Sequence, residues 1–356
     1  MKSKIKSALG EKRWRILAYR YQQFKSVQRY LSIYLSRPFM LSRRLSAILY
    51  VFSGSFDRES FASLKGRFRY MALAQKNYSL YRRNVHRLEK ALIMRPRRAK
   101  FAEDYIAELV SSHNALSPQL EDIHLEWGQH VLEEYFLAIE EGSSLIIDSA
   151  RQEFTADKNR NSQDRCKVPH TYADKIMSDV SYEQMLNLAK ARKSVRWFID
   201  KPVELSLIEK AVEVATQAPS ACNRQPFTFH FTNIPEKAQK IASYAMGSAG
   251  FISNIQSIVC IVGDLSYYDS THDRHVIYVD SSLANMQMLL ALETLGLGAC
   301  VLNWPDIADR DKKISTYLQL PDYQRVINLV VVGYPDPEGL IPYSDKKTSG
   351  QLIKEI

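Results

Sequence analysis

One helical segment constrains the fold of this chain more than any other feature. From Val276 to Leu297, apolar residues recur at helical spacing and cover most of the circumference, which is typical of a helix that is buried on nearly every side. Gly296 and Gly298 follow in the manner of a helix C-cap. We therefore expect this helix either in the core of a layered domain or in a dimer interface.

Short apolar runs typical of β-strands surround this helix. The strands are predicted at Phe227–Thr232, Ser257–Val262, Ala299–Leu302 and Val326–Val332. Helices are predicted at Glu183–Ala191, Ser206–Gln217 and Pro235–Ala245, with Ser206 as an N-cap. Helices interspersed with only four or five strands indicate an α+β layered domain from Tyr182 to the end of the sequence.

The residues before Tyr182 follow a different pattern. Residues 1–75 are basic, rich in aromatic residues and spaced like an amphipathic helix that ends at Arg37-Pro38. Residues 76–155 are interpreted as a helical domain, with helices at Ala91–Leu109 and Trp127–Ile139. Residues 156–181 are polar and turn-rich, which favours a linker.

Charge is distributed very unevenly. Residues 1–100 hold 25 basic and 4 acidic residues, a net charge of +21, although the whole chain carries only +9. Such a segment favours an anionic partner, and three interpretations stay open: a helix docked on the rest of the chain, a membrane-surface helix, or a nucleic-acid contact, which is least favoured because no recognised motif is present.

The longest apolar run, Leu45–Phe52, is too short to span a bilayer. A cytoplasmic protein is expected, with peripheral membrane contact as the alternative.

Several familiar kinds of site have no support. The four cysteines form no C-x-x-C pair and the histidines show no metal-ligand spacing, so no metal is expected. There is no Rossmann or P-loop glycine motif and no G-x-S-x-G or H-E-x-x-H. His86, Glu89 and Lys90 share a helical face, where a structural ion-pair cluster is favoured over a functional site.

Two short segments can carry chemistry. The first, Arg192-Lys193-Ser194-Val195-Arg196-Trp197-Phe198, offers three cations and a hydroxyl that suit an anionic group such as phosphate; a solvated basic face is the alternative. The second, Ala218-Pro219-Ser220-Ala221-Cys222-Asn223-Arg224-Gln225-Pro226-Phe227, is a loop stiffened by two prolines. Its Ser, Asn and Gln side chains suit the edge of a flat heterocycle; a turn capped by side chains is the alternative.

These two segments, followed by Leu295-Gly296-Leu297-Gly298 and Val332-Gly333-Tyr334-Pro335, resemble in content and order the nitroreductase family. The resemblance covers residues 182–350. It implies a mostly antiparallel central sheet flanked by helices, a homodimer, and a flavin mononucleotide (FMN) at the subunit interface. The preceding region, with His86-Arg87-Leu88-Glu89-Lys90, resembles that of nitroreductase-like proteins of bacterial polysaccharide gene sets.

The resemblance also assigns roles to residues. Arg192 and Ser194, with Lys193 between them, are expected at the phosphate, and Arg196 at the pyrimidine edge of the flavin. The remaining cofactor-binding residues that it implies are Pro219, Ser220, Asn223 and Gln225 along the ring, Leu302, Asn303 and Trp304 near its reactive nitrogen, and Lys346 or Lys347 at the phosphate. Tyr267, Tyr268 and His272 occupy the position of a substrate lid, but packing of a surface loop is the favoured role for each.

The expected function follows from the cofactor. An FMN-dependent oxidoreductase would transfer hydride between NAD(P)H and a small organic acceptor in a ping-pong mechanism, with chemistry centred on the flavin rather than on catalytic side chains. A link to surface polysaccharide metabolism is implied by the resemblance of the N-terminal region. The alternative is a non-catalytic flavin-binding or interaction protein, anchored to a membrane surface or partner by its basic N-terminus.

Overall fold

The computed structural model describes residues 2–154 and 166–356. The chain divides into two units, Met1–Ser60 and Phe61–Ile356, and each is described by itself. The linker expected at 156–181 lies in part outside the described residues, which resume at Cys166.

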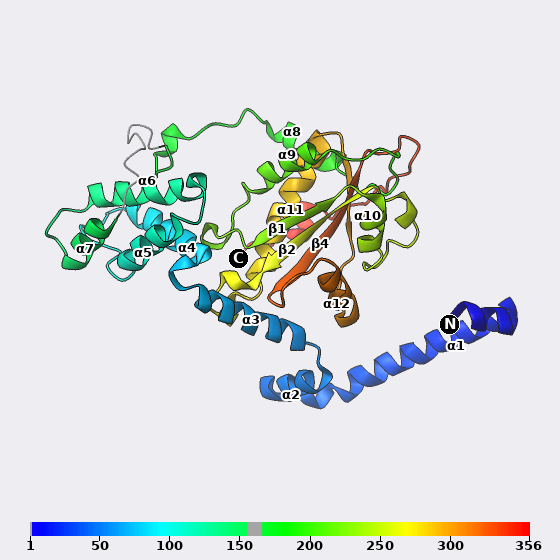
Figure 1. The fold of residues 1–356 in the computed structure, drawn as a ribbon. Helices are drawn as coiled ribbons and strands as arrows, with labels where there is room; N and C mark the ends of the chain where they lie inside the picture. Colours follow the sequence, from blue (N-terminus) through cyan, green and yellow to red (C-terminus); the bar gives the residue numbers. More distant parts are fainter. Residues whose placement is uncertain (1, 155–165) are drawn as a thin grey trace. The chain divides into compact units, whose positions relative to one another are not determined.

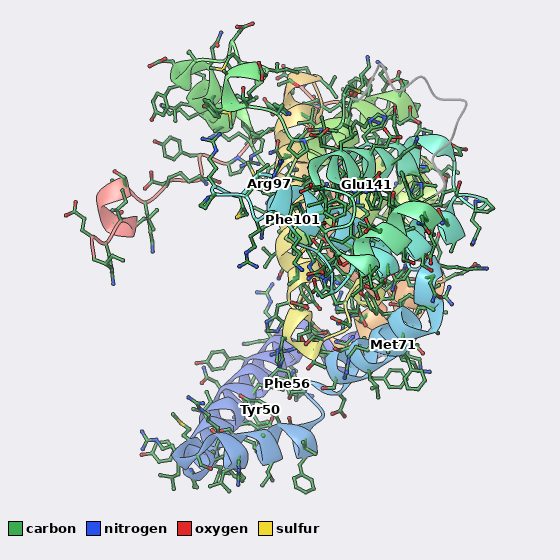
Figure 2. All side chains as sticks on the ribbon, turned by 90° about the vertical axis from the view of Figure 1, so that its left-hand side faces the viewer. Tyr50, Phe56, Met71, Arg97, Phe101 and Glu141 are labelled. Atoms are coloured by element: carbon green, nitrogen blue, oxygen red, sulfur yellow. The ribbon has the colours of Figure 1, made fainter. Side chains whose placement is uncertain are left out.

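The first unit is helical. It contains α1 (Lys2–Leu35), a 3-10 turn η1 (Arg37–Leu41) and α2 (Arg43–Ser53). The Ser42 hydroxyl accepts the Leu45 N–H at 3.1 Å and caps α2; Gly54, at a left-handed φ of +64°, ends it. The rings of Tyr50 and Phe56 lie 4.7 Å apart, centroid to centroid (Figure 2). Apolar and polar residues segregate more clearly on α2 than on α1. None of the described helices is both long and apolar enough to cross a membrane.

A cluster of helices opens the second unit. Its members are α3 (Asp57–Leu73), α4 (Tyr78–Leu92), α5 (Ile106–Leu116), α6 (Asp122–Ala138) and α7 (Leu145–Glu153). Fully buried Tyr81, Val85 and Leu132 form part of its core. The helix expected over Ala91–Leu109 is wrong, because α4 ends at Leu92 and α5 begins only at Ile106. Pro96 lies in this gap, and proline cannot supply the N–H that a continuing helix needs.

The rest of the second unit is built on one sheet. Its strands are β1 (Phe227–Thr232), β2 (Ser257–Asp264), β3 (Gly298–Leu302) and β4 (Gln324–Gly333), and its helices are α8 (Tyr182–Ala191), α9 (Leu205–Ala215), α10 (Pro235–Ala242), α11 (Val276–Thr294), α12 (Ala308–Tyr317) and α13 (Ser349–Leu352). The strand order is β1-β2-β4-β3, and every pairing is antiparallel. The α+β class expected from the sequence is confirmed. Ser206 does not cap α9, which begins one residue earlier after Glu204.

Helices cover both faces of the sheet (Figure 1). Along β2, side chains alternate because successive residues of a strand point to opposite faces. Ile258 and Cys260 join a core that includes residues of α10 and α12, whereas Val259 and Ile261 pack with residues of α9 and α11. The long helix α11 therefore packs on the sheet along one side.

A small core joins α3 to the sheet. Ala62 of α3 packs with Leu265, Tyr268, Ile277 and Ile327. A Cβ added at Gly66 would lie 2.6 Å from the carbonyl carbon of Leu265, so only glycine permits this approach of helix to backbone. The helical cluster is thereby fixed against the loop that follows β2.

Candidate functional site

The basic segment, Arg192–Phe198, is fixed across the ends of β3 and β4. The Val195 N–H donates to the Ala299 carbonyl at 3.0 Å. A Cβ at Gly298 would lie 2.8 Å from Cβ of Val195, and one at Gly333 would lie 2.6 Å from Cδ1 of Phe198. Glycine at these two positions therefore lets the segment lie directly on the sheet. Three of the four motifs noted in the sequence meet at this end of the sheet.

A cavity of about 680 Å³ opens beside the basic segment. Arg192, Lys193 and Ser194 line it together with Lys346 and Asp345 from the C-terminal segment. The Lys193 ammonium donates to the Tyr343 carbonyl at 3.3 Å, which ties the two segments together. With Lys190, the cavity lining holds four cations against one carboxylate, and together with the Ser194 hydroxyl they suit a phosphate group. Lys347, the other residue considered for this position, is not among the residues that line the cavity.

Arg196 belongs to the same basic segment but is not among the residues that line the cavity. Its guanidinium donates to the Ser194 carbonyl at 3.3 Å and lies 6.0 Å from the Phe251 ring centroid. Burial raises the pKa of the Cys300 thiol in β3, and the Arg196 and Arg192 guanidinium groups act in the opposite direction.

The segment 302–304 continues from this strand. Leu302 is buried beside β4, the Asn303 carbonyl accepts the Met246 N–H at 3.0 Å, and Trp304 packs against the neighbouring core. The basic segment and residues 302–304 thus lie along the same edge strand.

The proline-bracketed loop, Pro219–Pro226, holds its own conformation. The Ser220 hydroxyl accepts the Gln225 N–H at 3.1 Å, and the Gln225 amide donates to the Asn223 side chain at 2.8 Å. Cys222, Asn223 and Gln225 have left-handed φ values of 54°, 51° and 51°. Left-handed backbone is costly for residues other than glycine and persists where the surroundings fix it. The loop is therefore a constrained structure rather than a simple turn.

Asp280 and Arg82 hold this loop in place, although no sequence motif indicated either residue. The Asp280 carboxylate, on α11, accepts the Ala221 N–H at 2.9 Å, and burial raises the pKa of Asp280. The Arg82 guanidinium, on α4, donates to the Asn223 carbonyl at 2.7 Å and lies over the Trp127 ring at 5.1 Å. Because Arg82 lies 141 residues away in the chain, no local pattern could have indicated this contact.

His86 and Glu89 of α4 contact each other, and Glu89 also contacts Trp127. His86 lies 4.0 Å from the Glu89 carboxylate. Glu89 also accepts the Trp127 indole N–H at 2.9 Å, and Lys90 is exposed. The loop contact comes from Arg82, one helical turn before His86.

The three residues expected in a substrate lid have different surroundings. The Tyr268 side chain is buried in the core beside α3, at 2% exposure, with the Arg224 guanidinium 4.8 Å from its ring centroid. The Tyr268 ring therefore packs in this core and faces no open cavity, as the packing role favoured from the sequence would require. The Tyr267 carbonyl accepts the Ser79 hydroxyl of α4 at 2.8 Å. His272 is exposed.

The two candidate segments lie at opposite ends of the sheet. The basic segment pairs with Ala299, whose partner on β4 is Val332. The proline-bracketed loop leads into Phe227, which is opposite Gly263, and Gly263 is opposite Arg325 at the other end of β4. A ten-residue strand spans about 30 Å. Within one chain, Ser194 and Asn223 therefore do not line the same pocket.

The outer face of α11 is apolar and uncovered. Val279, Leu283 and Met286 are 57%, 43% and 43% exposed, whereas Ile277, Ala284 and Met288 of the same helix are fully buried. Val279, Leu283 and Met286 therefore lie on the open side of the helix, and the residues between them pack in the core.

Comparisons with known proteins match the part of the chain that contains the sheet. The profile of the Nitroreductase family matches residues 189–334. A protein of Archaeoglobus fulgidus named as an NADH dehydrogenase/NAD(P)H nitroreductase is 30% identical over 156 residues, which cover 44% of this chain and 88% of the relative. The chain belongs to the nitroreductase family. A protein of the same name from Methanothermobacter thermautotrophicus is 28% identical over 161 residues, covering 45% of this chain and 82% of the relative.

A solved nitroreductase structure from Parabacteroides distasonis, 28% identical, covers 48% of this chain and 97% of its own with a TM-score of 0.43. The nitroreductase-family match contains the sheet, the basic segment and the proline-bracketed loop. It leaves out residues 1–188, and with them Arg82 and the helical cluster. The α4 contact to the loop is therefore made by a part of the chain outside the family match.

Proposed function

We propose that the protein is an FMN-dependent oxidoreductase that transfers hydride between NAD(P)H and a small organic acceptor. The observation that carries the proposal is the cavity where Arg192, Lys193, Ser194 and Lys346 gather beside β3. This set of donors fits a phosphate, and the strand beside it leads toward residues 302–304. The names of the relatives from Archaeoglobus and Methanothermobacter, NAD(P)H nitroreductases, support a nicotinamide as the reductant.

The residues of the chain bind and orient the cofactor. Flavin, when bound, supplies the hydride chemistry. Arg192 and Ser194 hold the phosphate, with Lys193 and Lys346 adding positive charge. Arg196 would place a cation near the pyrimidine edge of the flavin and would so favour the reduced, anionic form of the cofactor. Asn303 and Trp304 follow directly after β3 and would lie near the reactive nitrogen of a flavin bound there.

The active site is completed by a second copy of the chain. Since the proline-bracketed loop and the basic segment lie at opposite ends of one sheet, a pocket lined by both needs two protomers. The exposed apolar face of α11, with Val279, Leu283 and Met286, suits burial in such a homodimer. Pro219, Ser220, Asn223 and Gln225 of one protomer would then line the flavin held by the other.

The mechanism that we propose is ping-pong, in which NAD(P)H and the acceptor use the same pocket in turn. We also propose a link to surface polysaccharide metabolism, which the resemblance of the N-terminal region implies without naming the acceptor. The domain division that goes with it is a basic helical segment at 1–75, a helical domain at 76–155, a linker at 156–181 and the flavin domain at 182–356.

Absorbance spectroscopy tests this proposal. Purified protein should be yellow and should lose its colour when NADH or NADPH is added without oxygen. Initial rates against NAD(P)H at several acceptor concentrations should give parallel reciprocal plots. A colourless preparation that takes up no added FMN would refute the flavin assignment, whereas bound flavin that neither nicotinamide reduces would favour a non-catalytic flavin-binding protein.

A specific observation favours membrane contact as a second function. In the first unit, Met40, Leu41, Val51 and Phe52 are 77%, 84%, 71% and 87% exposed beside the cationic Arg43 and Arg44. Apolar side chains with a cationic rim suit a lipid headgroup layer. Flotation with phosphatidylserine vesicles should carry the protein, less so at high salt. Phe52→Ser should reduce flotation, whereas Phe68→Ser, at another exposed phenylalanine, should not; equal behaviour of both variants would exclude this contact.

A further inference from the structure

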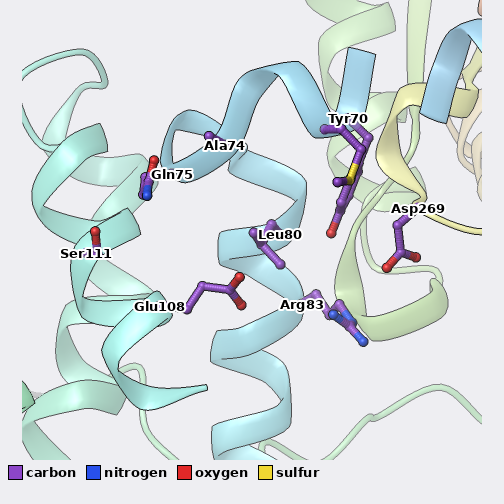
Figure 3. A pocket seen from close by; sticks show the side chains of 9 residues that line it. Tyr70, Ala74, Gln75, Leu80, Arg83, Glu108, Ser111 and Asp269 are labelled. Carbon is purple, nitrogen blue, oxygen red and sulfur yellow. The ribbon is translucent and has the colours of Figure 1, made fainter. Parts of the chain in front are cut away.

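A second cavity lies away from the sheet end that holds the basic segment. It occupies about 540 Å³ between α3, α4, α5 and the loop after β2 (Figure 3). Arg83 of α4, Glu108 of α5 and Asp269 of the loop each contribute a charged side chain to its lining, and Leu80 and Met71 contribute apolar surface. The proposed flavin chemistry uses none of these residues.

The charged groups of this cavity are not neutralised by one another. Among the described residues, no ion pair joins Arg83, Glu108 and Asp269. One oxygen of the Glu108 carboxylate accepts the Asn84 amide at 2.8 Å, which fixes its orientation. Neighbouring Arg87, in contrast, pairs with Asp104 at 3.0 Å. Unlike Arg87, Arg83 remains available for a group from outside the chain.

A buried hydroxyl also points to a ligand. The Tyr70 side chain is only 6% exposed, and its hydroxyl has no hydrogen-bond partner in the described part of the chain. Figure 3 shows this hydroxyl directed into the cavity, toward Arg83 and Asp269. Burial raises the pKa of Tyr70, so the group stays a neutral donor and acceptor. Leaving such a group without a partner costs free energy, and a ligand atom placed there would remove that cost.

The arrangement of charges specifies the ligand. In Figure 3, Tyr70, Arg83 and Asp269 lie on one side of Leu80, and Glu108 lies on the other. A guanidinium beside a carboxylate complements an α-carboxylate beside an α-ammonium group. Leu80 provides an apolar surface for an aliphatic chain, and Glu108 complements a second cation at the far end. We propose that this cavity is a binding site for a small α,ω-diamino acid.

Calorimetric titration of the full-length protein with its cofactor tests the site with three probes. L-Lysine carries every group that the site complements, L-norleucine lacks the distal ammonium, and 1,5-diaminopentane lacks the carboxylate. Lysine should bind tightest, and norleucine more weakly by roughly tenfold or more, the scale of one charged hydrogen bond. No heat from lysine at millimolar concentration, or equal affinity for lysine and norleucine, would overturn the proposal.

Three variants assign the contacts. Glu108→Gln should lower lysine affinity to the level of norleucine and leave norleucine unchanged. Arg83→Gln should weaken both amino acids but not 1,5-diaminopentane, and Tyr70→Phe should weaken both amino acids roughly fivefold. Arg98→Gln, at an exposed arginine outside the cavity, is the matched control. A loss of lysine binding that is the same in Arg83→Gln and Arg98→Gln would refute the site.

The outcome is independent of the flavin proposal. Glu108 is exposed, so Glu108→Gln keeps the test valid even where Tyr70→Phe unfolds the protein. Reduction of the cofactor by NAD(P)H is measured in the same variants and should not change. Lysine binding without cofactor reduction would support the binding site and refute the proposed enzyme activity. Cofactor reduction without lysine binding would support the enzyme activity and refute the binding site.

Discussion

The basic segment and the proline-bracketed loop are held in place by different kinds of contact. Backbone hydrogen bonds to β3 and close approach to Gly298 and Gly333 fix the basic segment. Side chains from elsewhere, Arg82 of α4 and Asp280 of α11, fix the loop. The first therefore depends on the sheet itself, whereas the second depends on helices α4 and α11 and on its own hydrogen bonds. Disturbing one support should affect one segment more than the other.

Acid should give the largest effect, and it should act on the helical cluster. His113 is 3% exposed and lies 3.0 Å from the Tyr81 hydroxyl of α4, and burial lowers its pKa from 6.5 to about 4. The unfolded chain therefore takes up the proton first. Above pH 6.5, neutral His113 makes its full contribution to the free energy of unfolding. This contribution, about 3 kcal/mol, is lost as the pH drops toward 4.

Urea unfolding followed across this pH range measures the loss. His113→Gln should make the acid dependence shallower, and exposed His124→Gln is the control within the same cluster. Hydrogen exchange near pH 5 should rise in α4 and the proline-bracketed loop before it rises in β3. If hydrogen exchange rose in the proline-bracketed loop and in β3 at the same pH, the two segments would not have independent supports.

Arg192→Ala should weaken FMN binding by about 1.5–3 kcal/mol, because a charged hydrogen bond to phosphate is lost. Fluorescence titration of the protein with FMN measures the change. Lys347→Ala is a control, since Lys347 does not line the cavity. Unchanged affinity in Arg192→Ala would mean that the phosphate binds elsewhere.

Gly333→Ala should destabilise the protein by about 1–3 kcal/mol, the usual cost of overpacking. The added Cβ would lie 2.6 Å from the Phe198 ring and would push the basic segment off the sheet. Thermal unfolding measures the cost, and FMN affinity should fall with it. Gly250→Ala, where an added Cβ meets nothing within 4 Å, should be close to neutral. Equal stability of the two variants would contradict the steric argument.

Arg82→Met should have the smallest effect, about 1 kcal/mol, because it removes one hydrogen bond to the Asn223 carbonyl while keeping an apolar stem over Trp127. We expect weaker FMN binding through the loop with little change in the basic segment. Arg97→Met, at an exposed arginine, is the control. A loop whose exchange rate does not respond to Arg82→Met would be held by Asp280 and its own hydrogen bonds.

The features that depend on local sequence patterns, namely the strand bounds and the short motifs, can be predicted from the sequence. The strands begin and end within two residues of their predicted bounds, because alternation and turn residues act over short range. The basic segment and the loop were likewise visible as short motifs, and Lys346 was one of two candidates. The helix predicted across Pro96 is wrong because proline lacks the N–H that a continuous helix needs at that position.

Only the tertiary structure shows which distant residues contact each other and where the two segments lie on the sheet. The sequence did not show that Arg82 and Asp280 reach the loop, that Tyr268 is buried, or that Ser194 and Asn223 lie at opposite ends of one sheet. These facts depend on strand register and on contacts between residues 59 to 141 positions apart. Such contacts leave no periodicity in the chain, because each requires only one suitable side chain at a single position.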